Sequence, residues 1–222
     1  GRIVHKHAAV GIKPSHYPIV ARHLLGAIAE VLGEAATPEL IAAWDEAYWL
    51  LAAELIAAET RLYERAQSGP DHRQPVRIVE RRQQAEDVVS FTLAPVTDAA
   101  LADFLPGQYI SVQVELAPGV LQQRQYSLSD APNGRTWRIS VKRDAGDADR
   151  PAGTVSNWLH DHAREGDVLL VSQPYGDFAP QLATDNPIVL MSAGVGITPM
   201  IATLNALAQQ SAGRKVVFSH AG

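Results

Sequence analysis

The sequence predicts a multidomain protein of mixed α and β structure, and three observations carry that prediction. Residues 1–68 are rich in Ala and Leu at helical spacing. Short β-rich runs then follow one another between turn signals, which is typical of a small antiparallel barrel. Near the C-terminus the pattern becomes strand, helix and strand, one βαβ unit of a parallel sheet. We therefore expect three domains with boundaries at 1–68, 71–184 and 185–222, the last of them truncated.

Two long helices are expected in the first segment. One begins near Pro14, because a proline in the first turn has no N–H to lose, and it ends near Gly33. Thr37-Pro38-Glu39 opens the next with a capping threonine, a first-position proline and a carboxylate at the positive end of the helix dipole. This second helix is expected to run to about Ala66.

The apolar stripe of the second helix contains a carboxylate. Glu59 lies about 40° from the centre of the stripe, whereas Glu54 lies about 100° away. A carboxylate on a core-facing stripe needs a partner, which makes Glu59 a candidate functional residue. The alternatives are neutralisation, a local backbone contact, or a side chain that reaches water. The stripe comprises Ile41, Trp44, Tyr48, Leu51, Leu55 and Leu62.

A linker is expected at Gln67–Pro75, because Gly and Pro interrupt the helix there. The barrel segment is expected to contain strands near Val76–Glu80, Val88–Leu93, Tyr109–Glu115, Gln123–Ser129, Trp137–Lys142 and Val168–Ser172, with a helix near Val155–Ala163. The βαβ unit is expected at Pro187–Ser192, Thr198–Gln210 and Lys215–His220.

Composition excludes several classes of protein. Of 222 residues, 46% are hydrophobic and 19% are charged, which suits a buried core and not a disordered chain. A net charge of −5 without a basic run argues against nucleic-acid binding. The absence of cysteine excludes disulfides, cysteine-held iron–sulfur clusters and thiol nucleophiles. The most apolar stretch, Tyr48–Ala58, is too short to span a membrane and no signal peptide is visible, so we expect a cytoplasmic protein.

Three short motifs follow one another along the chain. Arg124-Gln125-Tyr126-Ser127 ends a strand and offers a phosphate clamp, a ring for stacking and a hydroxyl. Gly153-Thr154-Val155-Ser156 opens a helix, whose free N–H groups suit a phosphate. Gly194-Val195-Gly196-Ile197-Thr198-Pro199 lies between a strand and a helix, where glycines let a pyrophosphate approach. Taken alone, each motif is better explained by ordinary structure: strand alternation with a surface Arg, a capped helix or a tight strand-to-helix turn.

Together and in this order, the three motifs resemble the ferredoxin-reductase family of flavin oxidoreductases. Pro106-Gly107-Gln108-Tyr109 is similar to that family's strand entry, and the resemblance covers about Arg73 to Gly222. It implies an FAD-binding antiparallel barrel followed by the start of a parallel NAD(P)-binding sheet. The residues implied at FAD are Tyr109, Arg124, Gln125, Tyr126, Ser127 and Ser156, and those at NAD(P) are Gly194, Val195, Gly196, Ile197, Thr198 and Pro199.

The helical segment resembles the globin half of flavohaemoglobins. The similarity is carried by Lys6-His7, by Ile12-Lys13-Pro14-x-x-Tyr17 and by Ala58-Glu59-Thr60-Arg61-Leu62-Tyr63. It implies partial globin helices in which His7 is the proximal ligand of haem b iron and Tyr17 and Glu59 form a relay. A carboxylate that accepts the other N–H of a ligating histidine raises the basicity of that ligand.

Alternatives to these assignments stay open in the sequence. His5, His16 and His23 are rival ligands on the same segment, and Tyr17 also suits a purely structural role in the core.

The resemblance to flavohaemoglobins implies an NAD(P)H-dependent nitric oxide dioxygenase. Hydride would pass to FAD and single electrons to haem, where bound O₂ oxidises NO to nitrate. NO and O₂ are then the small-molecule partners of a monomer that binds no nucleic acid. Two other functions are open: a haem-free FAD/NAD(P)H reductase that passes electrons to a partner, and a non-enzymatic haem oxygen carrier or sensor. Because the chain opens on Gly1 in mid-pattern, we expect an internal piece of such a protein, without its distal haem pocket.

Overall fold

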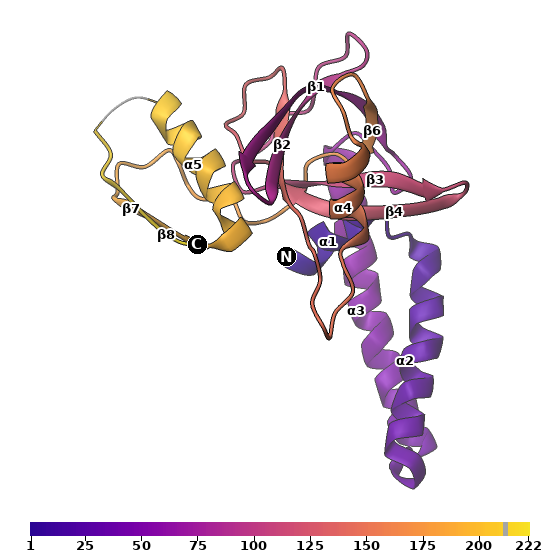
Figure 1. Cartoon of the computed structure of the whole chain (residues 1–222). Coiled ribbons are helices and arrows are strands. Elements are labelled where there is room, and N and C mark those ends of the chain that lie inside the picture. The colour runs from indigo at the N-terminus through magenta and orange to yellow at the C-terminus, as the bar shows by residue number, and fades with distance from the viewer. Residues whose placement is uncertain (211–212) are drawn as a thin grey trace. The chain divides into compact units, whose positions relative to one another are not determined.

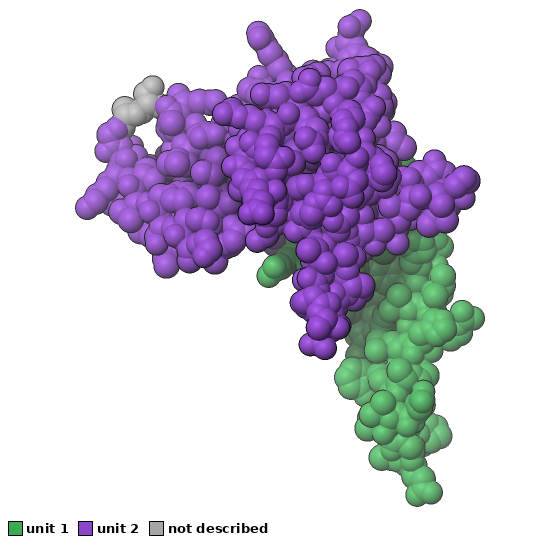
Figure 2. Space-filling model, viewed as in Figure 1, with its two compact units in different colours: residues 1–72 green, residues 73–222 purple. Residues whose placement is uncertain are grey.

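The computed structural model describes residues 1–210 and 213–222 (Figure 1). It divides the chain into two compact units, Gly1–His72 and Arg73–Gly222 (Figure 2). The first unit is helical, and the second contains a six-stranded and a two-stranded sheet. The predicted class of a multidomain α plus β protein is therefore confirmed. Both sheets belong to one compact unit, so a separate boundary between 184 and 185 stays a prediction.

Three α-helices form the first unit: α1 (Arg2–Val10), α2 (Tyr17–Leu32) and α3 (Pro38–Arg65). α2 and α3 lie side by side as a long hairpin (Figure 1). The sequence analysis missed α1, a helix of nine residues that has no side-chain cap at its start and ends at Gly11 in the left-handed region. A helix this short has little intrinsic stability and depends on the helix it packs against, here α3.

The second long helix begins where its caps predict but buries a different stripe. Thr37 Oγ1 accepts the backbone N–H of Leu40 at 3.3 Å, as expected of a cap. The predicted stripe is wrong in part, because Trp44 and Leu51 are 48% and 57% exposed. The residues of α3 that are buried are Ala52, Glu59 and Tyr63. Helical periodicity favours the large apolar side chains as the buried face. In the structure α3 packs against α1, and its buried residues are smaller or polar.

The six-stranded sheet has the order β4-β3-β6-β1-β2-β5, with every neighbouring pair antiparallel. A bridge between Leu128 and Ile139 joins its two edges, so the sheet closes into the predicted barrel. β1 is longer than expected and carries two bulges, which bend a strand and increase its twist. The strands are β1 (Gln74–Ala85), β2 (Val88–Pro95), β3 (Tyr109–Ala117), β4 (Val120–Ser127), β5 (Trp137–Lys142) and β6 (Val168–Val171).

Alternate residues of the strands fill the barrel with apolar side chains. Ile78, Phe91 and Ile139 are among those with no exposed surface. Helix α4 (Thr154–His162) contributes Val155 and Leu159 to the same core. A fully buried aliphatic or aromatic side chain contributes about 1.5–3 kcal/mol, so this core can hold β4 and α4 in place.

The two-stranded sheet pairs β7 (Ile188–Ala193) with β8 (Val216–Ala221) in parallel. A single turn, Gly194–Gly196, connects β7 to helix α5 (Ile197–Gln209). This is the expected βαβ unit, with the turn at the carboxyl end of β7. In the described part of the chain, no helix combines the length and the apolarity that crossing a membrane requires.

Candidate functional site

A histidine, a tyrosine and a glutamate converge in the helical unit. Nδ1 of His7 lies 2.7 Å from Oε1 of Glu59, and the hydroxyl of Tyr17 donates to the same oxygen at 2.6 Å. A carboxylate only accepts, so the proton of this contact lies on Nδ1 of His7. In the neutral imidazole, Nε2 then carries the free lone pair that could bind a metal.

The surroundings fix this arrangement. Glu59 is 2% exposed and Tyr17 is 5% exposed, whereas a third of the His7 side chain remains accessible. The hydroxyl of Tyr48 donates to the carbonyl of Tyr17 at 2.7 Å. The hydroxyl of Tyr63 donates to the carbonyl of Ile12, just after α1, at 3.0 Å. Two further tyrosines of α3 therefore hold the segments that carry His7 and Tyr17.

Burial keeps the Tyr17 hydroxyl protonated. Desolvation, followed by the hydrogen bond to Glu59, raises the pKa of Tyr17 well above its ordinary value. The phenol therefore remains a donor to Glu59 across the physiological pH range.

The rival histidines are placed differently. Nδ1 of His16 accepts the backbone N–H of Lys13 at 3.2 Å, and His23 is exposed on α2. His5 precedes His7 by two residues, about 200° away around the helix. Within residues 1–210 and 213–222, His7 is the histidine that contacts the buried carboxylate. Its role as an iron ligand stays a prediction.

The second group of candidate residues lies at the end of β4. The guanidinium of Arg124 is exposed, and its Nη1 donates to the adjacent carbonyl of Gln123 at 2.8 Å. The ring of Tyr126 packs against the core, and its burial raises the pKa of the phenol, which the charge of Arg124 partly opposes. The hydroxyl of the half-buried Ser127 has no hydrogen-bond partner in the described chain. The buried Oε1 of Gln122 also has no partner there.

Strand register brings Tyr109 to this group, because it pairs directly with Ser127 across β3 and β4. Gln125 is exposed on the same strand. Ser156 is 9% exposed in the first turn of α4, which contacts both β4 and β5. Its hydroxyl donates to the carbonyl of Gly153 at 3.3 Å, so the side chain is engaged within its own turn. The uncapped N–H groups at the start of α4 are the better phosphate donors.

The third group is the turn between β7 and α5. Gly194 has φ +50°, a left-handed conformation that favours glycine. Gly196 has an ordinary φ of −61°, and a Cβ placed on it meets no atom within 4 Å. The hydroxyl of Thr198 donates to the carbonyl of Val195 at 3.0 Å and braces the turn. No side chain caps α5, although the backbone N–H of Ile197 already donates to the carbonyl of Gly194 within the turn and Pro199 has no N–H.

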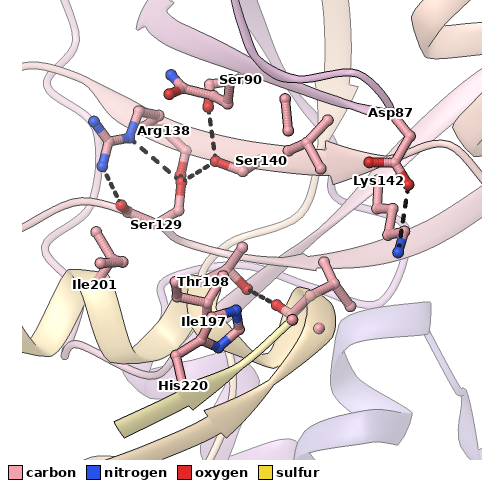
Figure 3. Close-up of a pocket in the computed structure, with 16 residues that line it drawn as sticks. Asp87, Ser90, Ser129, Arg138, Ser140, Lys142, Ile197, Thr198, Ile201 and His220 are labelled. Atoms are coloured by element: carbon pink, nitrogen blue, oxygen red, sulfur yellow. Dashed lines mark hydrogen bonds and ion pairs between the residues drawn. The ribbon is translucent and has the colours of Figure 1, made fainter. Parts of the chain in front are cut away.

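A cleft with a volume of about 500 Å³ lies between this turn and the barrel (Figure 3). Ile197, Thr198 and Ile201 line one wall. The opposite wall, called the serine wall below, comprises Ser90, Ser129, Arg138 and Ser140. Its hydroxyls form a chain, with 2.8 Å between Oγ of Ser90 and Ser140 and 2.9 Å between Oγ of Ser140 and Ser129. The cleft can therefore receive a flat molecule with polar edges beside a phosphate-binding turn.

Sequence reasoning missed the serine wall. Ser90 and Ser140 are partners in the register of β2 and β5, and Ser129 follows β4 by two residues. Isolated serines in alternating strands form no recognisable motif, and only the pairing of the strands brings them together. His220, at the end of β8, also lines the cleft and was placed in a strand without a role.

Comparisons with known protein families match both units. Residues 2–55 match the globin family, and residues 75–179 match the oxidoreductase FAD-binding domain. The predicted globin helices and FAD-domain barrel are thus confirmed as family assignments.

Curated relatives match nearly the whole chain. A flavohemoprotein of Chromobacterium violaceum is 50% identical over 224 residues, which cover 99% of this chain and 55% of the relative. A flavohemoprotein of Halalkalibacterium halodurans is 48% identical, with 99% and 54% covered. The chain spans about half the length of the curated relatives it matches.

Solved structures agree with these relatives. A flavohemoglobin from Malassezia yamatoensis, determined with bound FAD and heme, is 36% identical with a TM-score of 0.83, over 99% of this chain and 56% of that one. The FAD/NAD-binding domain of a nitric oxide dioxygenase from Vibrio cholerae is 40% identical with a TM-score of 0.61, over 66% and 61%. With globin helices followed by an FAD-domain barrel and a βαβ unit, the chain is similar to flavohaemoglobins (flavohemoproteins) over nearly its whole length.

Proposed function

We propose that this chain is the central part of an NAD(P)H-dependent nitric oxide dioxygenase. When bound, haem b, FAD and a nicotinamide dinucleotide supply the electron-transfer and oxygen chemistry that converts NO and O₂ to nitrate. The observation that carries the proposal is the double hydrogen bond to Glu59 Oε1 from His7 and Tyr17. The names of the relatives supply the rest, since one solved neighbour is a flavohemoglobin and another belongs to a nitric oxide dioxygenase.

The helical unit fits a haem. His7 offers Nε2 while Glu59 holds the Nδ1 proton, and Tyr17 neutralises part of the carboxylate's charge by donating to it. Ile3 lies one helical turn before His7 and is 56% exposed, which presents an apolar surface beside the ligand. The buried Glu59 makes the imidazole a stronger electron donor, a property that favours oxygen activation at iron.

The barrel fits a flavin nucleotide. The guanidinium of Arg124 has further N–H groups that can donate to a phosphate. Ser127 has an unpaired hydroxyl, and the ring of Tyr126 packs against the core. The unpaired Oε1 of Gln122 is a buried acceptor on the same strand, which a hydroxyl of the ligand would satisfy. The first turn of α4 adds backbone donors for a phosphate.

The cleft fits a nicotinamide dinucleotide. Gly196 leaves open space at the start of α5, where a pyrophosphate could approach the backbone of the turn closely. The serine wall offers hydroxyls that can donate to or accept from a carboxamide. Since a Cβ at Gly196 touches nothing in the chain, a substitution there tests the ligand and not the fold.

The deciding experiment is made on the full-length protein that contains this chain. We expect a Soret band, flavin absorbance, and consumption of NO to nitrate that depends on O₂ and on NADH or NADPH. A flavin spectrum without a Soret band would favour a haem-free reductase. A Soret band without NO consumption under reducing conditions would favour an oxygen carrier or sensor.

Two variants assign the flavin and nucleotide sites separately. Arg124→Ala should lower the retained FAD, measured by absorbance after gel filtration. Gly196→Val should raise KM for NAD(P)H while dithionite still reduces the flavin, and Gly196→Ala serves as the smaller matched change. Unchanged FAD content in the first variant, or unchanged nucleotide kinetics in the second, would place that cofactor elsewhere.

A further inference from the structure

Helix α5 presents one face to the cleft and to the barrel. Ile197, Ile201 and Asn205 recur at four-residue spacing on that face. The first two line the cleft, and Asn205 follows one turn later. Nδ2 of Asn205 donates to Oδ1 of Asp130, in the loop after β4, at 2.7 Å.

No other side chain of α5 makes a hydrogen bond to the barrel in the described part of the chain. The hydroxyls of Thr198 and Thr203 donate to carbonyls of the turn and of α5 itself. Ile197 and Ile201 on the same face are apolar, and apolar contacts have no preferred direction. The orientation of α5 against the barrel therefore depends on Asn205 for its directional contact.

Asp130 is itself held rigidly. Its Oδ1 also accepts the backbone N–H of Ala131 at 2.9 Å, and its Oδ2 lies 3.2 Å from Nη1 of Arg138. The guanidinium of Arg138 donates to the carbonyl and, at 3.4 Å, to the hydroxyl of Ser129. A continuous set of polar contacts thus runs from α5 through Asp130 to the serine wall (Figure 3 shows its Arg138–Ser129 end).

We propose that Asn205 is a positioning residue which, through Asp130, sets the distance between the turn at the start of α5 and the serine wall. Asp130 follows Ser127 by three residues, so the same contact ties the nucleotide turn to the strand that carries the flavin motif. The inference rests on the proposed nucleotide function of the cleft. Misplacing a reacting group by about 1 Å can cost on the order of 100-fold in rate, so a weakened tether should slow hydride transfer.

The test compares four variants of the full-length protein. Asn205→Asp is nearly isosteric and places a second carboxylate against Asp130. Gln210→Glu makes the same amide-to-acid change at the exposed C-cap of α5, about 140° around the helix from Asn205, and is the control. Asp130→Ala removes the acceptor, and the double variant Asp130→Ala/Asn205→Asp shows whether the change at Asn205 acts through Asp130.

Three quantities are measured: the rate of flavin reduction at saturating NADH, the rate with dithionite, and the Kd for NAD⁺ of the oxidised protein. Asn205→Asp should slow reduction by NADH roughly tenfold or more, with FAD content and dithionite reduction unchanged and with a much smaller effect on Kd. In the Asp130→Ala background, the change at Asn205 should slow reduction no further. The shift of the urea midpoint in the double variant should also differ from the sum of the shifts in the two single variants. This difference measures the coupling between Asn205 and Asp130 without any turnover.

The outcomes separate the inference from the function it rests on. A parent protein that neither NADH nor NADPH reduces overturns the proposed function and the inference together. A reducible parent whose Asn205→Asp variant matches it overturns the inference alone. A change at Asn205 that slows reduction as much again in the Asp130→Ala background, or a control that is equally slow, also overturns it, because the effect then does not pass through Asp130.

Discussion

The helical unit and the barrel bury their residues in different ways. The 28 residues of α3 bury Ala52, Glu59 and Tyr63, two of which are hydrogen-bonded polar groups. The 8 residues of β2 bury four side chains, of which Val89, Phe91 and Leu93 are apolar and have no exposed surface.

The difference shows two ways of holding a site. The barrel is stabilised by an apolar core, and its candidate ligands lie on strands that this core keeps in place. In the part of the helical unit that this chain contains, the buried residues form a directional polar centre whose members are also its candidate functional residues. We therefore expect changes in the barrel core to act on stability and changes in the relay to act on chemistry.

The largest expected effect is the loss of His7. His7→Ala in the full-length protein should abolish stable haem binding and NO consumption while NAD(P)H still reduces the flavin, because the two sites rest on separate units. The measurement is the Soret absorbance beside the rate of flavin reduction. A normal haem spectrum in this variant would assign the ligand to His5, His16 or His23.

A core change in the barrel should come next. Phe91→Ala removes a fully buried ring and should lower the free energy of unfolding by about 3–5 kcal/mol. Leu51→Ala on α3, where the leucine is 57% exposed, should cost no more than about 0.5 kcal/mol. Urea denaturation of the 222-residue chain measures both, and equal losses would contradict the contrast between the two units.

Glu59→Gln should act on chemistry with little effect on folding, because the amide keeps the volume of the carboxyl group. Turnover should fall by about 10–100-fold, and the iron reduction potential should rise as the imidazole loses electron density. Resonance Raman of the ferrous protein reports this as a lower Fe–His stretching frequency. Glu54→Gln, an exposed position on the same helix, is the control. An Fe–His frequency equal to that of the parent would remove Glu59 from the proximal relay.

The smallest effect is a dependence of stability on alkaline pH. Burial raises the pKa of Tyr17 and of Tyr126, so the folded chain keeps these protons above the pH of about 10 at which an unfolded tyrosine loses them. The free energy of unfolding should then fall as pH rises above about 10, by at most about 1.4 kcal/mol per pH unit for each phenol.

Two variants show how much of this loss of stability at alkaline pH comes from each unit. Tyr17→Phe and Tyr126→Phe should each flatten the decline in part, measured as urea-unfolding free energies across that pH range. A variant with the full slope of the parent would show that its tyrosine ionises normally in the folded chain.

The sequence by itself determined the order and type of the elements. The Thr37 cap, the proline after it and the alternation of the strands are local signals, and they placed α3 and the barrel strands within a few residues. The motifs at Arg124–Ser127 and Gly194–Pro199 are equally local, because a strand end and a strand–turn–helix each lie within one short stretch of chain. Glu59 could be singled out for the same reason, as a carboxylate on an apolar helix stripe.

Only the tertiary structure decided which residues meet. His7 and Glu59 are 52 residues apart, Ser90 and Ser140 are 50 apart, and Asp130 and Asn205 are 75 apart. Helix α1, the true buried stripe of α3, the serine wall and the Asn205 contact all depend on such pairs. Helical and strand periodicity indicate which face of an element turns inward. The residue that this face contacts is set by packing between elements that are distant in the chain, and no local pattern contains that information.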